Sequence, residues 1–300
     1  MSLYRIAGYL IEVKDNDSLS KLKSPDVIPG FSSFFTNREK TDEKPLLRFD
    51  TGVALGNRTV KPQYQFEFTG ITHAFSKDGN VYLFRMELPD NIHPRLVEIH
   101  REDDIFHAYG NLNNSDSDYV FRFAVLVAFG VAALSRQTVP VHASAVMYKD
   151  KSVLFLGESG TGKSTHARLW LKHITDTELL NDDCPFVCVE ADGNIQVCGS
   201  PWSGKTPCYK NKHTPVAAFV RLSQAPYNCI RRLTGINAIG AMLPSCPLTF
   251  TSDKQLSESI YSILSQVLQH TPVYYLECLP DVAAAKMVFD TLKRDNIFNI

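Results

Sequence analysis

Several kinds of segment are missing from this sequence of 300 residues. No apolar run approaches the roughly 20 residues that a helix needs to cross a bilayer; the longest covers 123–134, between Arg122 and Arg136. The polar stretch 14–17 comes too early to leave room for the apolar core of a secretory signal peptide. We therefore expect a cytoplasmic protein without a membrane partner, and a buried helix over the longest apolar run.

Cysteine patterns typical of metal or disulfide frameworks are also missing. Seven cysteines lie in the C-terminal half, and none forms a Cys-x-x-Cys pair. Their spacings do not fit ordinary zinc sites, and an odd count in a chain without a secretion signal favours reduced thiols. The sequence therefore predicts free thiols and no zinc site.

An excess of one charge is absent as well. The net charge is −1, so no global field attracts nucleic acid or an anionic membrane, and we expect no nucleic-acid partner. Hydrophobic residues at 44% and charged residues at 21% are ordinary for a folded globular chain. Any charged partner must be met by a local patch, and a homo-oligomer is left open.

Two regions differ in their hydrophobic period. Up to about residue 110 apolar residues mostly alternate, as in 4–13, 64–68 and 81–88, which predicts an antiparallel sheet. The polar stretch 111–118 interrupts this pattern, and Asp118 is suited to cap a helix over about 119–135. We predict a smaller, mainly β domain over 1–117 and an α/β domain over 118–300.

The C-terminal region mixes strands and helices. A strand over 139–148 and the strand 152–156 flank the tight turn 149–151, which predicts a hairpin. The further expected elements are a helix 163–174, a hairpin of 186–190 with 195–198, a helix 255–270, a strand 273–277 and a helix 281–293.

The most specific motif is Gly-Glu-Ser-Gly-Thr-Gly-Lys-Ser over 157–164, which has the residue types and spacing of a phosphate-binding loop between a strand and a helix. Its glycines permit backbone angles at which successive N–H groups surround phosphate oxygens. Lys163 supplies a charge for the β and γ oxygens, Ser164 a hydroxyl for Mg²⁺, and Thr165 is a second candidate for that hydroxyl. The motif predicts that ATP and Mg²⁺ are bound by Gly157, Glu158, Ser159, Gly160, Thr161, Gly162, Lys163, Ser164 and Thr165.

Two aspartates and a histidine are candidates for chemistry beside this loop. Asp182 and Asp183 follow a short apolar run about twenty residues past Lys163, where a metal-holding aspartate is expected. One can bind Mg²⁺ while the other accepts a proton from an acceptor hydroxyl, and which does which is left open; Ser164 and Asp183 are the predicted metal ligands. His142 lies one strand before the loop, and the hairpin would return it to the phosphate cradle. The alternatives are an aspartate turn and a buried structural histidine.

A window of one charge sign follows the aspartates. No carboxylate occurs over 193–252, although six lysines or arginines do. This predicts a surface that faces nucleotide phosphate or an acidic acceptor, with Lys205, Arg221 and Arg231 as contact candidates; a solvated basic face is the alternative. The segment 199–206 carries a second Ser-Gly-Lys-Thr at 203–206. We interpret it as a mobile loop, anchored by Trp202, that brings Lys205 to the phosphate or the acceptor.

The order of these motifs carries a family resemblance. The segments 142–146 (His-Ala-Ser-Ala-Val), the phosphate loop and 180–183 (Leu-Asn-Asp-Asp) resemble the C-terminal catalytic domain of HPr kinase/phosphorylase and, more distantly, ATP-dependent phosphoenolpyruvate carboxykinase. The likeness covers about 119–290 and implies an α/β carboxykinase-like P-loop domain with a mixed, β-rich sheet. It also implies that the histidine, the lysine and the aspartates surround the metal and the γ-phosphate, with an arginine on the transferred group.

The resemblance leaves the acceptor open. No glycine-rich segment follows the aspartates like the one by which HPr kinases hold their protein substrate, and the chain looks most like HPr-kinase-related bacterial proteins of unassigned substrate. The leading hypothesis is a Mg²⁺-dependent kinase that transfers the γ-phosphoryl group of ATP to a hydroxyl, such as a serine of a protein or peptide. Its predicted catalytic residues are Asp182, Asp183, His142 and Lys163. The alternatives are a regulator that binds nucleotide without transfer and, with least support, decarboxylation of the carboxykinase type.

Overall fold

The chain forms two compact units that each contain a large β-sheet. The computed structural model describes residues 1–14, 28–37, 43–56, 58, 60–89, 93–112, 117–204 and 206–298. The first unit comprises 1–136 and 248–257, and the second comprises 137–247 and 258–300. The expected mixed α/β class with two sheets is confirmed, but the units divide after Arg136 and not at 117/118.

The position of this division follows from helix α1 (Asp118–Leu134). The helix packs against strands of the first unit, and most of its residues are buried. A helix that is apolar on nearly all sides must be covered, but its sequence does not say by which sheet. Its N-cap is Ser117 and not Asp118, which lies in the first turn and serves the helix as an acidic residue near the positive end of the dipole.

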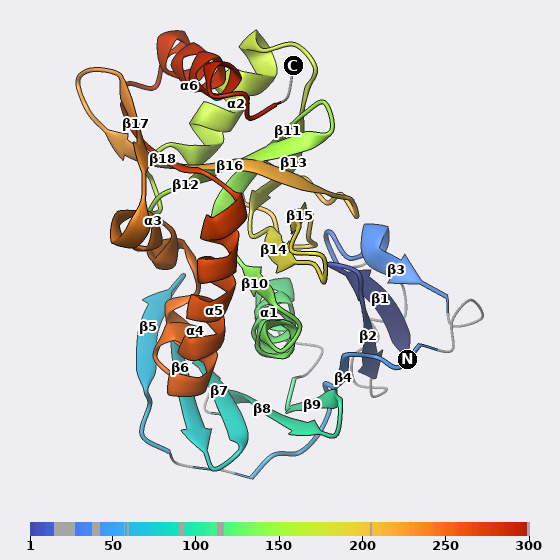
Figure 1. The fold of residues 1–300 in the computed structure, drawn as a ribbon. Coiled ribbons are helices and arrows are strands. Elements are labelled where there is room, and N and C mark those ends of the chain that lie inside the picture. Colours follow the sequence, from blue (N-terminus) through green and yellow to red (C-terminus); the bar gives the residue numbers. More distant parts are fainter. Residues whose placement is uncertain are drawn as a thin grey trace. The chain divides into compact units, whose positions relative to one another are not determined.

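The sheet of the first unit has the strand order β3-β1-β2-β4-β9-β8-β7-β6-β5 and curves around α1 (Figure 1). Pairs β2–β4 and β4–β9 are parallel, so the predicted antiparallel sheet is in fact mixed. Long connections allow β4 to enter between strands that it does not adjoin in the sequence. The elements are β1 (Ser2–Ile6), β2 (Tyr9–Lys14), β3 (Phe35–Thr36), β4 (Leu47–Asp50), β5 (Tyr64–Phe68), β6 (Ile71–Asp78), β7 (Val81–Glu87), β8 (Arg95–Glu102), β9 (Ile105–Gly110) and α4 (Leu248–Thr251).

The sheet of the second unit has the order β10-β14-β15-β16-β12-β11-β13, with β18 beside β16 and β17 beside β18. Its elements are β10 (Thr138–Pro140), β11 (Ala143–Tyr148), β12 (Lys151–Leu156), α2 (Lys163–His173), β13 (Thr177–Asp183), β14 (Phe186–Val189), β15 (Ile195–Cys198), β16 (His213–Gln224), β17 (Cys229–Leu233), α3 (Gly235–Met242), β18 (Val273–Cys278) and α6 (Val282–Arg294). Helix α5 (Lys254–His270) begins in the first unit and continues into the second.

Most predicted elements of this unit are confirmed, including the β11–β12 hairpin, α2, the β14–β15 hairpin, β18 and α6. The predicted strand 139–148 is divided into β10 and β11. Between them the chain changes partners: Val141 N–H donates to the carbonyl of Pro185, and His142 N–H to that of Ser245. His142 therefore lies outside regular strand structure, immediately before the first residue of β11.

Three neighbouring strands, β12, β16 and β18, run parallel to one another. Their carboxyl ends consequently meet at one edge of the sheet, next to the start of α2. Helices α2 and α6 lie together in Figure 1, and their apolar side chains share one core with the sheet, in which Trp170 and Phe155 are fully buried. This core holds the strand, the phosphate loop and the helix as a rigid unit. Among the helices of the described residues, none combines the length and the apolar character needed to cross a membrane.

Candidate functional site

The predicted phosphate loop connects β12 to α2. Gly157, Gly160 and Gly162 have φ angles of 149°, 84° and 105°, which residues with a Cβ rarely adopt. A Cβ on Gly157 would also lie 2.5 Å from Thr161 Oγ1. Gly162 is the N-cap of α2, so the positive end of the helix dipole faces the loop. The strand, loop and helix predicted from the motif are confirmed.

Lys163 is buried, with 7% of its surface exposed. Its Nζ donates to the carbonyls of Gly157 and Glu158 at 2.9 and 3.1 Å, and no carboxylate of the described chain lies within ion-pair distance of it. Burial lowers the pKa of Lys163, Asp183 and Asp182 raise it, and Arg221 lowers it. The ammonium group is thus surrounded by the charges of the predicted site without being neutralised by direct contact with one of them.

Strand register aligns several candidate residues in one row across the sheet. Asp183 pairs with Ala143, Ala143 with Leu156, and Leu156 with Arg221. Arg221 in turn pairs with Tyr275, and Tyr275 with Arg231. Since Leu156 directly precedes the loop, the row places a carboxylate on one side of the loop and two arginines on the other.

Asp182 is held deep in the sheet. It is 3% exposed, and Ser144 Oγ donates to its Oδ1 at 2.5 Å. The preceding Asn181 is fully buried and fixes the turn after the pair: its Oδ1 accepts from the N–H groups of Asp183 and Cys184, and its Nδ2 donates to the carbonyls of Ser200 and Trp202. The aspartate pair is therefore rigidly positioned.

Asp183 and His142 form the exposed part of the same cluster. The side chains are 46% and 47% exposed, and His142 Nε2 lies 3.8 Å from Asp183 Oδ1. Although an edge of the imidazole is accessible, partial burial and, secondarily, the charge of Lys163 lower the pKa of His142 to about 4. At neutral pH the ring is uncharged and can hydrogen-bond a ligand or water. The structure thus brings His142 next to Asp183.

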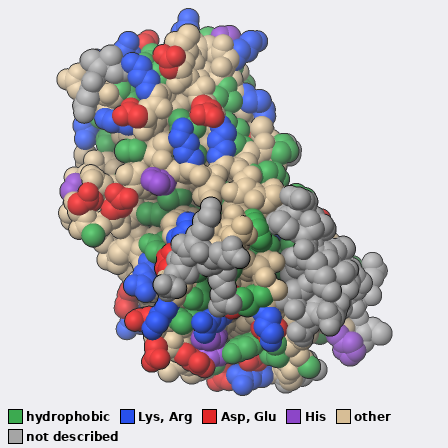
Figure 2. Space-filling view, turned by 90° about the vertical axis from the view of Figure 1, so that its right-hand side faces the viewer, with side chains coloured by type: hydrophobic (Ala, Val, Ile, Leu, Met, Phe, Trp, Pro, Cys, Tyr) green, Lys and Arg blue, Asp and Glu red, His purple; other side chains and the backbone are tan. Residues whose placement is uncertain are grey.

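The basic window separates into different environments. Arg221 donates to the carbonyl of Ala241 and lies 3.6 Å from Glu158 of the loop. Arg231 lies over the ring of Tyr275 at 4.7 Å. By contrast, Lys210 and Lys212 both form ion pairs with Glu178, away from the loop. Lys205 lies outside the described residues. Figure 2 shows acidic and basic side chains interspersed over the face in view.

The second Ser-Gly-Lys-Thr segment has glycines for a packing reason. A Cβ on Gly199 would lie 2.0 Å from the carbonyl oxygen of Lys210, and one on Gly204 would lie 2.9 Å from that of Asp182. Gly204 N–H donates to the Asp182 carbonyl at 2.8 Å, and Trp202 is buried against Phe186. The described part of this segment is therefore fastened to the aspartate strand, with Trp202 as an anchor.

Two hollows adjoin the phosphate loop. One, of about 550 Å³, lies between residues 160–166 of the loop and helix and the strand ends at 222–225 and 278–280. The other, of about 500 Å³, is lined by Glu158, Ser159, Arg221, Ser223 and Tyr275 among others. They share Gly160, Thr161, Leu222 and Gln224, and Gln224 Nε2 donates to the Gly160 carbonyl. A ligand on the loop can therefore extend into either hollow.

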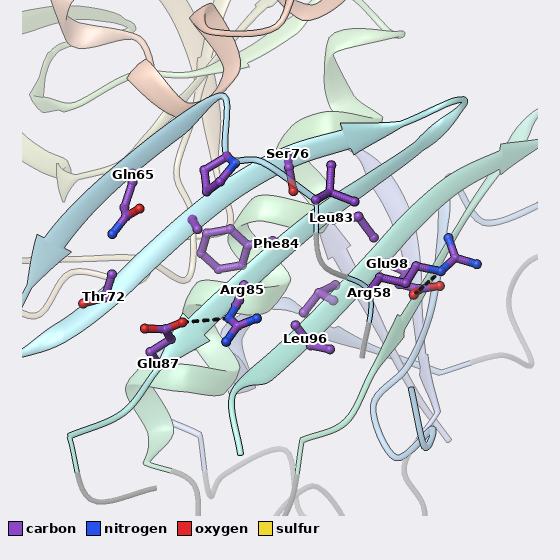
Figure 3. A pocket seen from close by; sticks show the side chains of 14 residues that line it. Arg58, Gln65, Thr72, Ser76, Leu83, Phe84, Arg85, Glu87, Leu96 and Glu98 are labelled. Atoms are coloured by element: carbon purple, nitrogen blue, oxygen red, sulfur yellow. Dashed lines mark ion pairs between the residues drawn. The ribbon is translucent and has the colours of Figure 1, made fainter. Parts of the chain in front are cut away.

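The first unit also has a pocket, of about 240 Å³, on the face formed by β5 to β8 (Figure 3). Its charged side chains contact one another: Arg85 Nε lies 2.8 Å from Glu87, and Arg58 Nε lies 3.5 Å from Glu98. None of the residues predicted from the sequence lies there, and its charges are already paired. The loop of the second unit is therefore the better candidate site.

The donors near the loop suit a hard cation. Ser164, Asp182 and Asp183 offer hydroxyl and carboxylate oxygens, which Mg²⁺ prefers, and Mg²⁺ commonly completes its shell with water and phosphate. Within the described residues no cluster of three or more His, Cys, Asp or Glu side chains forms a protein-only metal site. The seven cysteines are free. The residues present fit a Mg²⁺ ion that arrives with a nucleotide.

Several residues of the site were missed by the sequence analysis. Tyr275 occupies an ordinary strand position, so only the pairing of β16 with β18 reveals it, whereas Ser144 lies in the segment 142–146 that carried the family resemblance. Asn181 adjoins the aspartate pair and lies in the segment that carried the family resemblance, which was a usable signal. His166 follows the motif by two residues and lines the larger hollow.

Comparison with known proteins adds no relative. The chain matches no protein-family model, and a search of curated proteins returns no match. The geometry of the loop and its neighbours is therefore the basis for assigning a function.

Proposed function

We propose that this protein is a Mg²⁺-dependent kinase that transfers the γ-phosphoryl group of ATP to a hydroxyl acceptor, in a carboxykinase-like P-loop domain similar to that of HPr kinases. The observation that supports this most is the position of the aspartate pair and His142 next to the buried Lys163. Phosphoryl transfer requires a phosphate cradle, metal ligands, a residue that positions or deprotonates the acceptor, and cations for the transferred group.

The difference in exposure divides the roles of the two aspartates. An acceptor entering from solvent can reach Asp183, so Asp183 is the proposed proton acceptor. Asp182, fixed by Ser144, is then the aspartate that supports the metal and its water together with Ser164. Bound there, Mg²⁺ would neutralise charge on the β- and γ-phosphates. This proposal departs from the sequence-based expectation that Asp183 is the metal ligand.

The acceptor oxygen forms a bond to the γ-phosphorus while its proton passes to Asp183, and the bond from the γ-phosphorus to the oxygen bridging the β-phosphate breaks to release ADP. Lys163 and Arg221 hold the negative oxygens, and neutral His142 hydrogen-bonds either the γ-phosphate or the acceptor.

Nucleotide binding is tested by thermal unfolding with and without ATP and Mg²⁺. Ligand at 100 times its Kd stabilises a protein by about 2.7 kcal/mol, which corresponds to roughly 5–10 °C for a unit of this size. We expect this increase for the wild type and for Lys172→Ala, which changes an exposed lysine on the same helix, and not for Lys163→Ala. No stabilisation of the wild type would refute the proposal.

Transfer itself is tested with ATP labelled in the γ-phosphate and cell extract. We expect label on a protein, a peptide or a small molecule that depends on Lys163 and Asp183. Stabilisation by ATP together with unchanged γ-phosphate across extracts would instead identify a nucleotide-binding regulator.

A further inference from the structure

The larger hollow beside the phosphate loop differs in character from its neighbour. Its walls on the sheet side are the apolar residues Leu222, Ala225, Leu279 and Pro280, with Cys278 between them. No charged side chain of the described chain lines it. The neighbouring hollow contains Glu158 and Arg221. A flat, uncharged group such as a nucleobase is therefore better accommodated by the larger hollow.

The strand order gives the hollow its place along a bound nucleotide. Lys163, whose pKa Asp183 and Asp182 raise, marks the end for the terminal phosphate, and these aspartates lie on β13, on one side of β12. The larger hollow lies on the opposite side, at the carboxyl ends of β16 and β18. A triphosphate wrapped by the loop thus has its γ-phosphate toward the aspartates and its nucleoside toward the hollow.

His166 is the unexplained polar group of this hollow. It lies on α2, is 3% exposed, and its Nε2 is buried without a hydrogen-bond partner among the described residues. Leaving a buried polar atom unsatisfied costs about 1–3 kcal/mol, so such an atom calls for a ligand or a water. Its ring packs edge-on against Phe155 at 4.7 Å, which keeps the imidazole at the wall.

The chemistry of this imidazole suits a neutral ligand. A neutral imidazole has one donor and one acceptor nitrogen. His166 lines the hollow, and turning its ring by 180° exchanges the carbon and nitrogen positions within the same outline. The polar edge of a purine and the ribose hydroxyls offer matching partners.

We propose that the hollow between the phosphate loop and residues 222–225 and 278–280 binds the nucleoside of the nucleotide, and that His166 hydrogen-bonds it. This inference rests on the proposed function, because it takes the loop to bind a nucleoside triphosphate. Beyond the proposed function, it assigns to His166 the recognition of the nucleoside, which a nucleotide has and an inorganic polyphosphate lacks.

The test compares the dissociation constants of ATP, ADP and inorganic tripolyphosphate, each with Mg²⁺, by calorimetric titration. Losing one hydrogen bond weakens binding by about tenfold. We expect His166→Phe to weaken ATP and ADP by about this factor and to change tripolyphosphate binding less than twofold. His173→Phe, which changes an exposed histidine on the same helix, should match the wild type.

A second variant tests the same hollow independently, in case His166→Phe does not fold. Ala225→Trp places a large neutral side chain in the hollow from a partly exposed position, and should weaken ATP by at least tenfold while tripolyphosphate still binds. Equal affinity of the wild type for ATP and tripolyphosphate, or ATP binding unchanged in both variants, would overturn the nucleoside site and leave the loop intact. A wild type that binds none of the three ligands would overturn the proposed function as well.

Discussion

The two sheets of this protein treat their charged side chains differently. On the sheet of the first unit, acidic and basic residues contact each other: Arg48 of β4 with Glu12 of β2, Arg85 with Glu87 within β7, and Arg58 with Glu98 of β8. At the loop edge of the second sheet, Arg221 forms an ion pair with Glu158, but Lys163 contacts carbonyls and Asp182 contacts a hydroxyl. Exposed ion pairs stabilise a protein only slightly. Charged groups that lie close together without pairing are instead typical of a site that binds a ligand.

Strand direction explains why the group of charged residues around Lys163 forms in the second sheet. The parallel strands β12, β16 and β18 end at one edge, so the residues that follow them meet there. In the first unit the strands β5 to β9 form an antiparallel meander, and successive strands end at opposite edges. The comparison predicts that substitutions at the loop edge change chemistry, and that those on the first sheet change only stability.

The largest expected effect is that of Asp183→Asn. Loss of a general base slows transfer by about 100- to 10,000-fold, while the dissociation constant of ATP should change by less than about threefold. Labelled phosphate transfer and calorimetric titration measure the two quantities. Asp150→Asn, in the exposed turn between β11 and β12, is the matched control and should transfer normally. If Asp183→Asn transferred phosphate as fast as the control, the aspartate pair would have a structural role only.

Gly199→Ala should lower the free energy of unfolding by about 3 kcal/mol, because the new Cβ would meet the Lys210 carbonyl at 2.0 Å. Urea unfolding measures this. Gly240→Ala is the control: it lies in helix α3 with open space around it, and alanine should stabilise the helix by about 0.5–1 kcal/mol. If Gly199→Ala folded as stably as the wild type but no longer bound ATP, the second Ser-Gly-Lys-Thr segment would belong to the binding site after all.

Acid should destabilise the loop region through His166. Because the folded pKa, about 4, lies below the ordinary 6.5, the unfolded chain binds a proton that the folded chain does not. Stability is therefore complete above about pH 6.5 and is lost as the pH falls toward 4, by about 2 kcal/mol between pH 7.5 and 4.5. In urea titrations His166→Phe should lose less stability over this range, and His173→Phe should behave as the wild type does. The same acid loss in His166→Phe would exclude this cause.

The smallest effect is expected on the first sheet. Arg58→Ala removes an exposed ion pair with Glu98, so the free energy of unfolding should change by less than about 1 kcal/mol. ATP binding should be unchanged. A loss of ATP affinity above about threefold in the titration would show that the pocket of the first unit takes part in the site, and would end the contrast between the two sheets.

Prediction from the sequence succeeded where neighbouring residues determine structure. The motif 157–164 predicted the strand, the loop and the helix, and the turns at 149–151 and 192–194 predicted the two hairpins of the second unit. The turn at 78–80 also joins β6 and β7 as expected. Each depends on backbone angles that a few consecutive residues adopt or avoid.

Prediction was wrong where distant residues decide. The helix 118–134 was assigned to the C-terminal domain because the polar stretch precedes it, but its apolar surface is covered by the first sheet. The strand 139–148 was expected to be continuous, but its halves pair with different strands. In both cases the competing interaction is burial against a partner far away in the sequence.

The sequence by itself determined that a glycine-rich loop joins a strand to a helix over 152–173, because the glycines, the lysine and the flanking apolar strand are contiguous and act through local backbone geometry. Only the tertiary structure decided that Asp183, Arg221 and Tyr275 share one row across the sheet, because strand order and register are selected by the burial of the whole core. The same holds for the buried, unpaired nitrogen of His166, which the packing of α2 against the sheet creates.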